Sequence, residues 1–415
     1  MDKISVYQNE IFSRKRERMN KVLQVENLTD AMRELEKIEV SSRGVVVMAP
    51  KMFGVGIKLT NLKVGAANIL KQEMLSIGGD AAVARGAVNG TKEISDVILL
   101  CNIDKLQKLT KKLGSQTIFG LPEIRKYLTE IVDDFLHPKF HKLNFNDNEI
   151  ELQPTKIMGI LNVTPDSFSD GNKFIDAEIA VQHAEKMIEN GADFIDIGGE
   201  STRPNAIKVD AKTELKLVIP IIEKLPKTVP ISIDTTKAIV ARKAIEAGAS
   251  IVNDISALRF DAQMVEVLQD FPKVSVVLMH MLGNPQNMQK NPVYTDVIDE
   301  ILDFFAERIE FCEKNGILRD RIILDPGIGF GKRQTDNLQI LKKIAEFKTL
   351  NLPVILGASR KSFIGEIDGS NCTERLVGSL ATTALAFQNN IEIVRVHDVL
   401  EHKKMLKTLM KIRKN

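Results

Sequence analysis

A regular alternation of short apolar runs with amphipathic helical patterns, from residue 138 to the end, most constrains the fold of this chain. The apolar runs begin near Lys156, Asp193, Val229, Ser250, Val274, Arg321, Pro353 and Glu392. Each run has the length of a buried strand, and a helix-length pattern follows it. Eight strands that alternate with helices predict a (β/α)₈ barrel for residues 138–415 rather than an open dinucleotide-binding sheet.

The pattern changes near residue 137, where His137-Pro138 ends an amphipathic segment. We therefore expect residues 1–137 to form a separate, smaller α/β domain, whose role the sequence does not reveal. Within it, Val45–Met48 and Val97–Leu100 are interpreted as buried strands, and helices are expected near 61–76, 102–113 and 121–135. The glycine-rich segment 78–86 is interpreted as a backbone turn in preference to a ligand loop.

Charge and cysteine content exclude several classes of function. The 57 basic and 55 acidic side chains nearly cancel, so a nucleic-acid partner is not expected. The three cysteines, Cys101, Cys312 and Cys372, are far apart and lack the spacing of a zinc site or a disulfide framework. The N-terminus has no apolar signal run, and its basic cluster around Arg14 is interpreted as a solvated helix face. We expect a cytoplasmic protein without membrane contact.

Polar residues follow the predicted strands of the barrel in a repeated way. The carboxyl ends of barrel strands converge on one mouth, where the active sites of such folds are built. Eight independent polar placements there predict an active site. The residues are Asn162, Thr202-Arg203, Asp234, Asn253, His280, Asp325, Arg360-Lys361 and Arg395 with His397.

These residues also carry a family resemblance. The segment Met158–Gly171, MGILNVTPDSFSDG, resembles the opening signature of the dihydropteroate synthases. The resemblance covers the whole second domain, and only Asn172 and Ala257 stand where the family often has glycine. Further matching motifs follow in order: Gly198–Pro204, Ser232–Thr235, Val252–Asp254, Met279–Met281, Asp325–Lys332, Ser359–Ser362 and Arg395–Asp398.

The resemblance implies a transferase of folate biosynthesis that joins 6-hydroxymethyl-7,8-dihydropterin pyrophosphate to p-aminobenzoate. A pterin edge presents an amino group and a ring N–H together, which a carboxylate accepts in fork geometry. The pterin-binding residues implied are Asp234, Asn253, Met279, Asp325 and Lys361. Taken alone, Asp234 would be interpreted as the N-cap of a helix and Asp325 as a turn residue before Pro326-Gly327.

Loss of pyrophosphate requires groups that stabilise the charge of the leaving group. The resemblance implies Asn162, Thr202, Arg395 and His397 for this role, with Mg²⁺ as cofactor and Asn162 as its protein ligand. Without the resemblance, Asn162 could equally tie its own loop. The catalytic set implied is Asn162, Asp170, Arg203, Lys361, Arg395 and His397.

Two loops, 166–173 and 201–207, are expected to close over the site and complete the pocket of the amine. Sulfonamides would compete there, and the resemblance also implies a homodimer. Phe330 can alternatively be plain core, and His280 is interpreted as a structural group. The residues implied for p-aminobenzoate are Phe168, Ser201, Thr202, Pro204, Phe330, Arg360 and Ser362.

Two other functions fit a pterin-binding barrel. A methyltetrahydrofolate:corrinoid methyltransferase needs no pyrophosphate pocket, so Arg395-Val396-His397 argues against it. A non-catalytic pterin-binding paralogue would not need to keep the loop from Asn162 to Gly171 intact. Pyrophosphate release in the presence of both substrates separates the synthase from the non-catalytic alternative.

Overall fold

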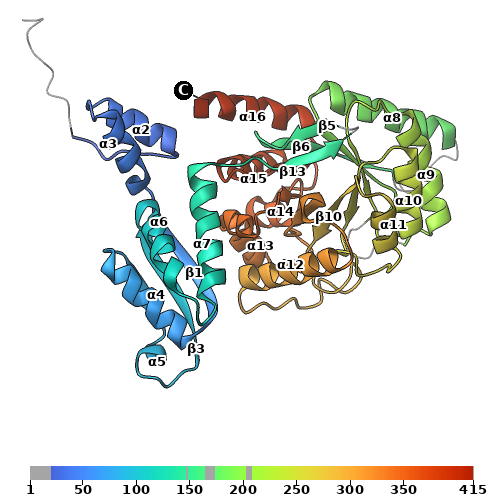
Figure 1. Cartoon of the computed structure of the whole chain (residues 1–415). Coiled ribbons are helices and arrows are strands. Elements are labelled where there is room, and N and C mark those ends of the chain that lie inside the picture. Colours follow the sequence, from blue (N-terminus) through green and yellow to red (C-terminus); the bar gives the residue numbers. More distant parts are fainter. Residues whose placement is uncertain (1–19, 146–147, 164–172, 202–207, 415) are drawn as a thin grey trace, which may run out of the picture. The chain divides into compact units, whose positions relative to one another are not determined.

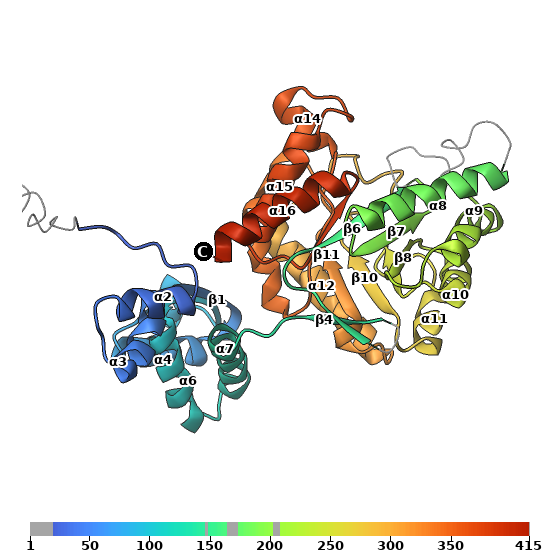
Figure 2. The same ribbon diagram turned by 90° about the horizontal axis from the view of Figure 1, so that it is seen from above.

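The computed structural model describes residues 20–145, 148–163, 173–201 and 208–414 (Figures 1 and 2). The chain divides into two compact units, the first ending at Lys139 and the second beginning at Phe140. Each unit has its own hydrophobic core. Within the described residues, no helix combines the length and the apolar character that crossing a membrane requires.

The first unit is built on a three-stranded antiparallel sheet in the order β1-β3-β2, with β1 at Gly54–Lys63, β2 at Asp80–Val83 and β3 at Ile94–Asn102. Alternate side chains of the sheet, such as Leu59, Val97 and Leu99, are buried against helices. The helical elements are α2 (Leu28–Glu36), α3 (Ser42–Met48), η1 (Ala49–Met52), α4 (Val64–Ser76), α5 (Arg85–Val88), α6 (Ile103–Lys112), η2 (Leu113–Ser115) and α7 (Leu121–Leu136).

Three features of this unit bear on the sequence predictions. The strand predicted at Val45–Met48 is wrong, because these residues lie in α3, where Ser41 caps the helix by accepting a hydrogen bond from the Gly44 N–H at 3.3 Å. Strand β1 was not predicted. The turn at 78–86 is partly confirmed, since Gly78, at φ +74°, ends α4 in a left-handed conformation, and the chain then enters β2.

The second unit is an eight-stranded parallel barrel, and all eight predicted strands are confirmed. The strand order is β11-β10-β9-β8-β7-β6-β13-β12, and a bridge between Leu324 and Val354 joins β11 to the segment before β12. The strands are β6 (Lys156–Asn162), β7 (Phe194–Gly198), β8 (Ile231–Asp234), β9 (Ile251–Asp254), β10 (Ser275–Met279), β11 (Ile322–Asp325), β12 (Ile355–Leu356) and β13 (Ile393–Val396).

Helices surround the barrel, as Figure 2 shows for α8 to α11. They are α8 (Lys173–Glu189), α9 (Ala211–Lys224), α10 (Ala238–Ala247), α11 (Met264–Asp270), α12 (Val297–Lys314), α13 (Gln334–Lys342), α14 (Ser362–Asp368), α15 (Leu376–Gln388) and α16 (Val399–Lys414). Short 3₁₀ turns, η4 (Arg319–Arg321) and η5 (Ile344–Leu350), complete the unit.

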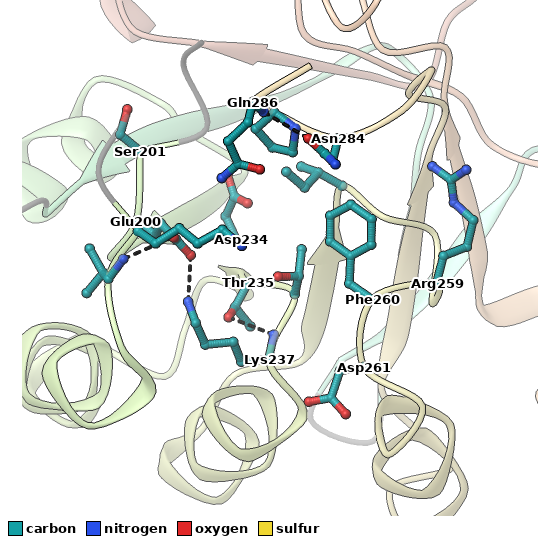
Figure 3. A pocket seen from close by; sticks show the side chains of 15 residues that line it. Glu200, Ser201, Asp234, Thr235, Lys237, Arg259, Phe260, Asp261, Asn284 and Gln286 are labelled. Atoms are coloured by element: carbon teal, nitrogen blue, oxygen red, sulfur yellow. Dashed lines mark hydrogen bonds and ion pairs between the residues drawn. The ribbon is translucent and has the colours of Figure 1, made fainter. Parts of the chain in front are cut away.

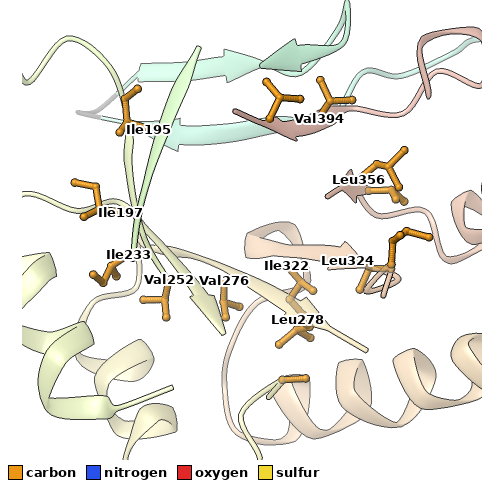
Figure 4. Close-up of a cluster of buried hydrophobic side chains, with 14 of the residues drawn as sticks. Ile195, Ile197, Ile233, Val252, Val276, Leu278, Ile322, Leu324, Leu356 and Val394 are labelled. Carbon is orange, nitrogen blue, oxygen red and sulfur yellow. The ribbon is translucent and has the colours of Figure 1, made fainter. Parts of the chain in front are cut away.

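Side chains of the strands alternate between two apolar layers. One set, which includes Ile195, Val252 and Leu324, packs in the large core between strands and helices (Figure 4). The other set fills the barrel interior together with Leu143 and Leu152, which come from the hairpin of β4 (Lys142–Phe145) and β5 (Asn148–Glu151) and its exit. The interior residues of the strands are Met158, Phe194, Ile251, Val277, Ile323, Ile355 and Ile393.

Candidate active site

A polar layer lies directly above the apolar layer of the barrel interior. Because side chains in a strand alternate, the residue two positions after an interior residue faces the interior as well, one level closer to the mouth. This places Asp196 above Phe194, Asn253 above Ile251 and Asp325 above Ile323. Arg395 stands in the same way above Ile393, and Met279 above Val277. The strand pattern therefore brings most of the predicted pterin residues to one level.

Strand register places predicted residues of neighbouring strands side by side. Gly198 of β7 pairs with both Asn162 of β6 and Asp234 of β8, and Asp234 pairs in turn with Asn253 of β9. On the other side of the barrel, Met279 pairs with Asp325.

Arg395 is the centre of a buried ion-pair network. Its Nε donates to Asp196 Oδ2 at 2.6 Å and its Nη2 donates to Asp234 Oδ2 at 2.9 Å. Asn253 Nδ2 also donates to Asp196 Oδ2, at 3.2 Å. Asp196 is fully buried, and sequence reasoning missed it. A carboxylate in the otherwise apolar strand FIDIG was the available signal.

The electrostatics of Asp234 follow from its burial. Desolvation raises the pKa of Asp234 to about 7, although Arg395 opposes the shift, and Asp196 adds to it. The alternative role of Asp234 as a helix cap is wrong, because α10 begins only at Ala238 and its N-cap residue is Lys237. A buried carboxyl that caps no helix remains available to a ligand.

One carboxylate oxygen of Asp325 holds its own loop, and the other can bind a ligand. Its Oδ1 accepts a hydrogen bond from the Gly327 N–H at 2.7 Å, so the predicted turn role is present. Burial raises its pKa, and the charge of Lys361 opposes that rise. Lys361 Nζ lies 4.1 Å from the ring centre of Phe330, and this cation–π contact helps to hold the ammonium group in place. Phe330 is itself buried.

His397 and Arg360 are held by neighbours that follow β12 and β13. His397 Nδ1 lies 3.0 Å from Ser359 Oγ, and burial, with Arg395 second, lowers the His397 pKa to about 4. His397 is therefore neutral near pH 7. Arg360 pairs with Asp398 through Nε at 3.0 Å and through Nη2, so its guanidinium is already engaged. Ser362 is the exposed first residue of α14.

Asn162 ends β6 with its side chain exposed, and no hydrogen bond of its amide is found within the described residues. One amide oxygen, with phosphate oxygens and water, suits Mg²⁺, which keeps several non-protein ligands. The part of the chain that the structure describes contains no cluster of three His, Cys, Asp or Glu side chains able to hold a metal. The donors present thus fit a metal that arrives with a phosphate ligand.

Beside Asp234, a cavity of about 560 Å³ opens at the mouth (Figure 3). Ser201 lines it, together with Glu200, Lys237 and Phe260. The other predicted loop residues lie outside the described part of the chain, so their positions are not described. They are Phe168, Asp170, Asn172, Thr202, Arg203 and Pro204, and the basic cluster near Arg14 lies outside it too.

Comparison with known proteins identifies the family of this chain. Residues 158–397 match the family model of pterin binding enzymes. A dihydropteroate synthase from Synechocystis is 48% identical over 248 residues, which are 59% of this chain and 86% of that protein. A crystal structure of the Yersinia pestis dihydropteroate synthase with a sulfonamide drug superimposes with a TM-score of 0.62 at 40% identity, covering 66% of this chain and 100% of that one.

The chain belongs to the dihydropteroate synthases, within the pterin-binding enzymes. Its activity is that of a dihydropteroate synthase, a transferase of folate biosynthesis. This decides against the methyltransferase and the non-catalytic paralogue.

A further dihydropteroate synthase relative extends beyond the barrel. A probable bifunctional folylpolyglutamate synthase/dihydropteroate synthase from Halobacterium salinarum is 39% identical over 379 residues, covering 91% of this chain and 45% of that protein. A match of this length is longer than the barrel unit and so reaches well into the first unit. The first unit is therefore shared with at least one relative that carries a second enzyme.

The loop after β11 holds a buried lysine that sequence reasoning about this synthase also missed. Lys332 Nζ lies 2.9 Å from His280 Nδ1 and donates to the carbonyls of His280 and Phe330 at 3.2 and 3.1 Å. Burial lowers the Lys332 pKa to about 7. Burial also lowers the His280 pKa well below its usual range, with Lys332 adding to the effect. His280 is thus a hydrogen-bonded buried group, in keeping with its predicted structural role.

Proposed function

We propose that the polar layer of the barrel mouth binds the dihydropterin ring. Asp325 and Asp234 accept hydrogen bonds from the ring's amino and N–H groups, Asn253 and Lys361 serve its remaining polar atoms, and Met279 packs on its face. The buried network of Arg395, Asp196 and Asp234 supports this proposal, because it fixes the carboxylates before the ligand arrives.

We propose that pyrophosphate leaves beside Asn162 and His397. Neutral His397 donates a hydrogen bond to a phosphate oxygen, while Arg395 and Thr202 contribute further donors. The carbon–oxygen bond between the pterin methylene and pyrophosphate breaks, the arylamine nitrogen bonds to that carbon, and the proton that the amine loses leaves with the pyrophosphate. A bound Mg²⁺ would neutralise charge on the phosphate oxygens, with Asn162 as its protein ligand. Asp170 and Arg203 are proposed to complete the catalytic set by excluding water from the reacting carbon.

The p-aminobenzoate pocket is proposed at the cavity that Ser201 lines, between the pterin site and the edge of the mouth. Sulfonamides would occupy the same place, and the Yersinia pestis enzyme does form a complex with a sulfonamide drug. The residues proposed for this pocket are Phe168, Ser201, Thr202, Pro204, Phe330, Arg360 and Ser362.

The experiment that tests these roles follows pyrophosphate and dihydropteroate formation from both substrates with and without Mg²⁺. We expect formation with Mg²⁺, near-complete loss on its removal, and loss of pterin binding in Asp234→Ala with the fold retained. Normal turnover without any divalent cation would contradict the metal assignment. Near-normal pterin affinity in Asp234→Ala would remove Asp234 from the pocket.

We also propose that residues 138–415 are the catalytic domain and residues 1–137 a separate domain. Residues 138–415 expressed alone should retain turnover. An inactive but folded barrel would contradict this division, and circular dichroism separates that outcome from misfolding.

For the first unit, we propose a docking role towards a folylpolyglutamate synthase, on the pattern of the probable bifunctional relative from Halobacterium. The uncovered face of its sheet exposes Ile98 and Leu100, at 43% and 49% of their surface. Size-exclusion chromatography with the folylpolyglutamate synthase of the same organism should give a complex that Leu100→Asp weakens. Separate elution at micromolar concentrations would contradict this role.

A homodimer through helices α13 to α15 is proposed as well. Leu338 of α13, Ile367 of α14 and Val377 of α15 are apolar side chains exposed by 40%, 61% and 78%, and we propose that a second copy covers them. Light scattering should give twice the chain mass for the wild type and the single mass for Val377→Asp. A monomeric wild type would contradict the dimer.

A further inference from the structure

A charged cluster outside the pterin site links three elements of the barrel mouth. Lys237 Nζ donates to Glu200 Oε2 at 2.5 Å (Figure 3). The same ammonium donates to Glu214 Oε2, also at 2.5 Å. Glu200 follows β7, Glu214 lies in the first turn of α9, and Lys237 caps the start of α10. One ammonium group thus joins the ends of two successive strand-to-helix connections.

The cluster is largely shielded from solvent, so its charges have to be compensated within the protein. Glu214 is fully buried, while the Lys237 and Glu200 side chains are 24% and 23% exposed. Burial raises the pKa of Glu214 although Lys237 opposes the shift. Burial works against the charge of Lys237, but its hydrogen bonds to the two carboxylates raise the Lys237 pKa overall. Removing the ammonium would leave two carboxylates facing each other in a poorly hydrated place.

Glu200, which directly precedes Ser201 in the chain, makes a second contact. Its second oxygen, Oε1, accepts a hydrogen bond from the Val209 N–H at 3.1 Å. The Glu200 carboxylate thus contacts both Val209 and Lys237, and Ser201 directly follows Glu200 in the chain. The position of Ser201 at the cavity therefore depends on Lys237.

The same cluster reaches the pterin site through one residue. Thr235, next to Asp234 in the chain, accepts a hydrogen bond at its Oγ1 from the Lys237 N–H at 3.3 Å. The charge of Glu214 also contributes to the raised pKa of Asp234. The cluster thus lies close to Asp234, whose own ion pair is with Arg395.

We propose that Lys237, with Glu200 and Glu214, is a positioning residue for the amine substrate: it fixes Glu200, and through Glu200 the adjoining Ser201, beside the pterin site. This inference rests on the proposed place of p-aminobenzoate beside Ser201. Lys237 need not touch either substrate. Its loss should displace the amine pocket and leave the pterin pocket, which Arg395 and Asp196 hold, in place.

The test compares Lys237→Met, which keeps the aliphatic stem, with Lys237→Arg, which keeps the charge. Calorimetry measures pterin pyrophosphate affinity, and steady-state kinetics measure the KM for p-aminobenzoate and the inhibition constant of a sulfonamide. For Lys237→Met we expect the amine KM and the sulfonamide constant to rise roughly tenfold or more, because small misplacements of a binding group are costly. Pterin affinity should change by less than about twofold, and Lys237→Arg should recover part of the loss.

Lys243→Met is the matched control, since Lys243 lies in the same helix and pairs only with the exposed Glu246 among the ion pairs of the described residues. It should leave all three constants unchanged. Should Lys237→Met fail to fold, Glu200→Gln keeps the size of the side chain and should raise the amine KM in the same direction. Equal losses for pterin and amine, or a normal amine KM in a folded variant, would overturn the inference. The wild-type arm tests the proposed function separately, through product formation itself.

Discussion

Arg395 Nε lies 2.6 Å from Asp196 Oδ2 at the floor of the barrel mouth. The pair is almost entirely shielded, with side-chain exposures of 18% and 0%. Because Asp196 also accepts from Asn253, it holds a cation and an amide in place with one oxygen. The site is therefore organised by a residue that was not among the predicted ligand contacts.

Asp196→Ala tests this organisation. Breaking a buried pair leaves a poorly compensated charge, so we expect the free energy of unfolding to fall by about 3 kcal/mol. Pterin affinity should fall as well, because Asn253 loses its partner. Urea denaturation and pterin titration measure the two effects. A loss of stability below about 1 kcal/mol would mean that the pair behaves like a solvent-exposed one.

Gly327→Ala should disable the pterin site through the backbone. Gly327 has φ +67°, and an added Cβ would lie 2.1 Å from the His280 carbonyl oxygen. The loop would have to move, and with it the Gly327 N–H that donates a hydrogen bond to Asp325. We expect the free energy of unfolding to fall by more than about 2 kcal/mol. Gly316→Ala is the control, since Gly316 has φ +75° but no atom near its added Cβ, and should cost only about 1 kcal/mol. Unchanged pterin affinity in folded Gly327→Ala would contradict this argument.

The sequence predicted the architecture well because its main signal is periodic. The strands are short, mostly apolar runs with polar residues at or soon after their carboxyl ends, and Asp234, Asn253 and Asp325 were found because they stand at or next to such ends. Strand periodicity cannot tell a buried strand from a short apolar helix, which is why Val45–Met48 was wrong: the Ser41 cap decided for helix. In the first unit, Gly54 and Gly56 interrupt β1 and weakened its apolar pattern.

Residues that act across the fold were harder to predict. Asp196 lies inside a strand rather than at its end, and its partner Arg395 is 199 positions away in the sequence. The cluster of Lys237, Glu200 and Glu214 joins three elements in the same way. Single charged residues of this kind are common on solvated surfaces, so only the three-dimensional structure distinguishes them.

His402→Leu should stabilise the protein. His402 is fully buried, and neither ring nitrogen has a hydrogen-bond partner within the described residues. Leucine would remove that unsatisfied polar group, so we expect a gain of about 1 kcal/mol in the free energy of unfolding near pH 7. His183→Leu, at an exposed position of α8, should change stability by less than about 0.5 kcal/mol. A destabilised His402→Leu protein would show that the ring is satisfied in solution.

His402 also predicts that the free energy of unfolding depends on pH in the acid range. Burial lowers the His402 pKa from 6.5 to about 4, so the unfolded chain takes up a proton at a pH where the folded one does not. The part of the free energy of unfolding that depends on neutral His402 is fully present above pH 6.5, and it is lost as the pH falls towards 4. Urea unfolding of wild type and His402→Leu at pH 7 and pH 5 should therefore show a larger advantage of the variant at pH 5. An advantage independent of pH would contradict the shift.

Asp234 predicts the opposite dependence of stability on pH in the ligand-free protein. Burial raises its pKa from 3.8 to about 7, so its contribution to stability is present below pH 3.8 and is lost as the pH rises through 7. Asp234→Asn resembles the protonated carboxyl and should gain stability relative to wild type between pH 5 and pH 8. Urea denaturation at both values measures the difference, and a constant difference would mean that Asp234 is ionised throughout.

The most direct measurement is a crystal structure of the protein with a pterin pyrophosphate analogue, Mg²⁺ and a sulfonamide. We expect a pterin within hydrogen-bond distance of Asp234, Asn253 and Asp325, pyrophosphate oxygens beside Asn162 and His397, and the sulfonamide next to Ser201. A pterin bound away from these three side chains, or phosphates at another edge of the barrel, would contradict the proposed site.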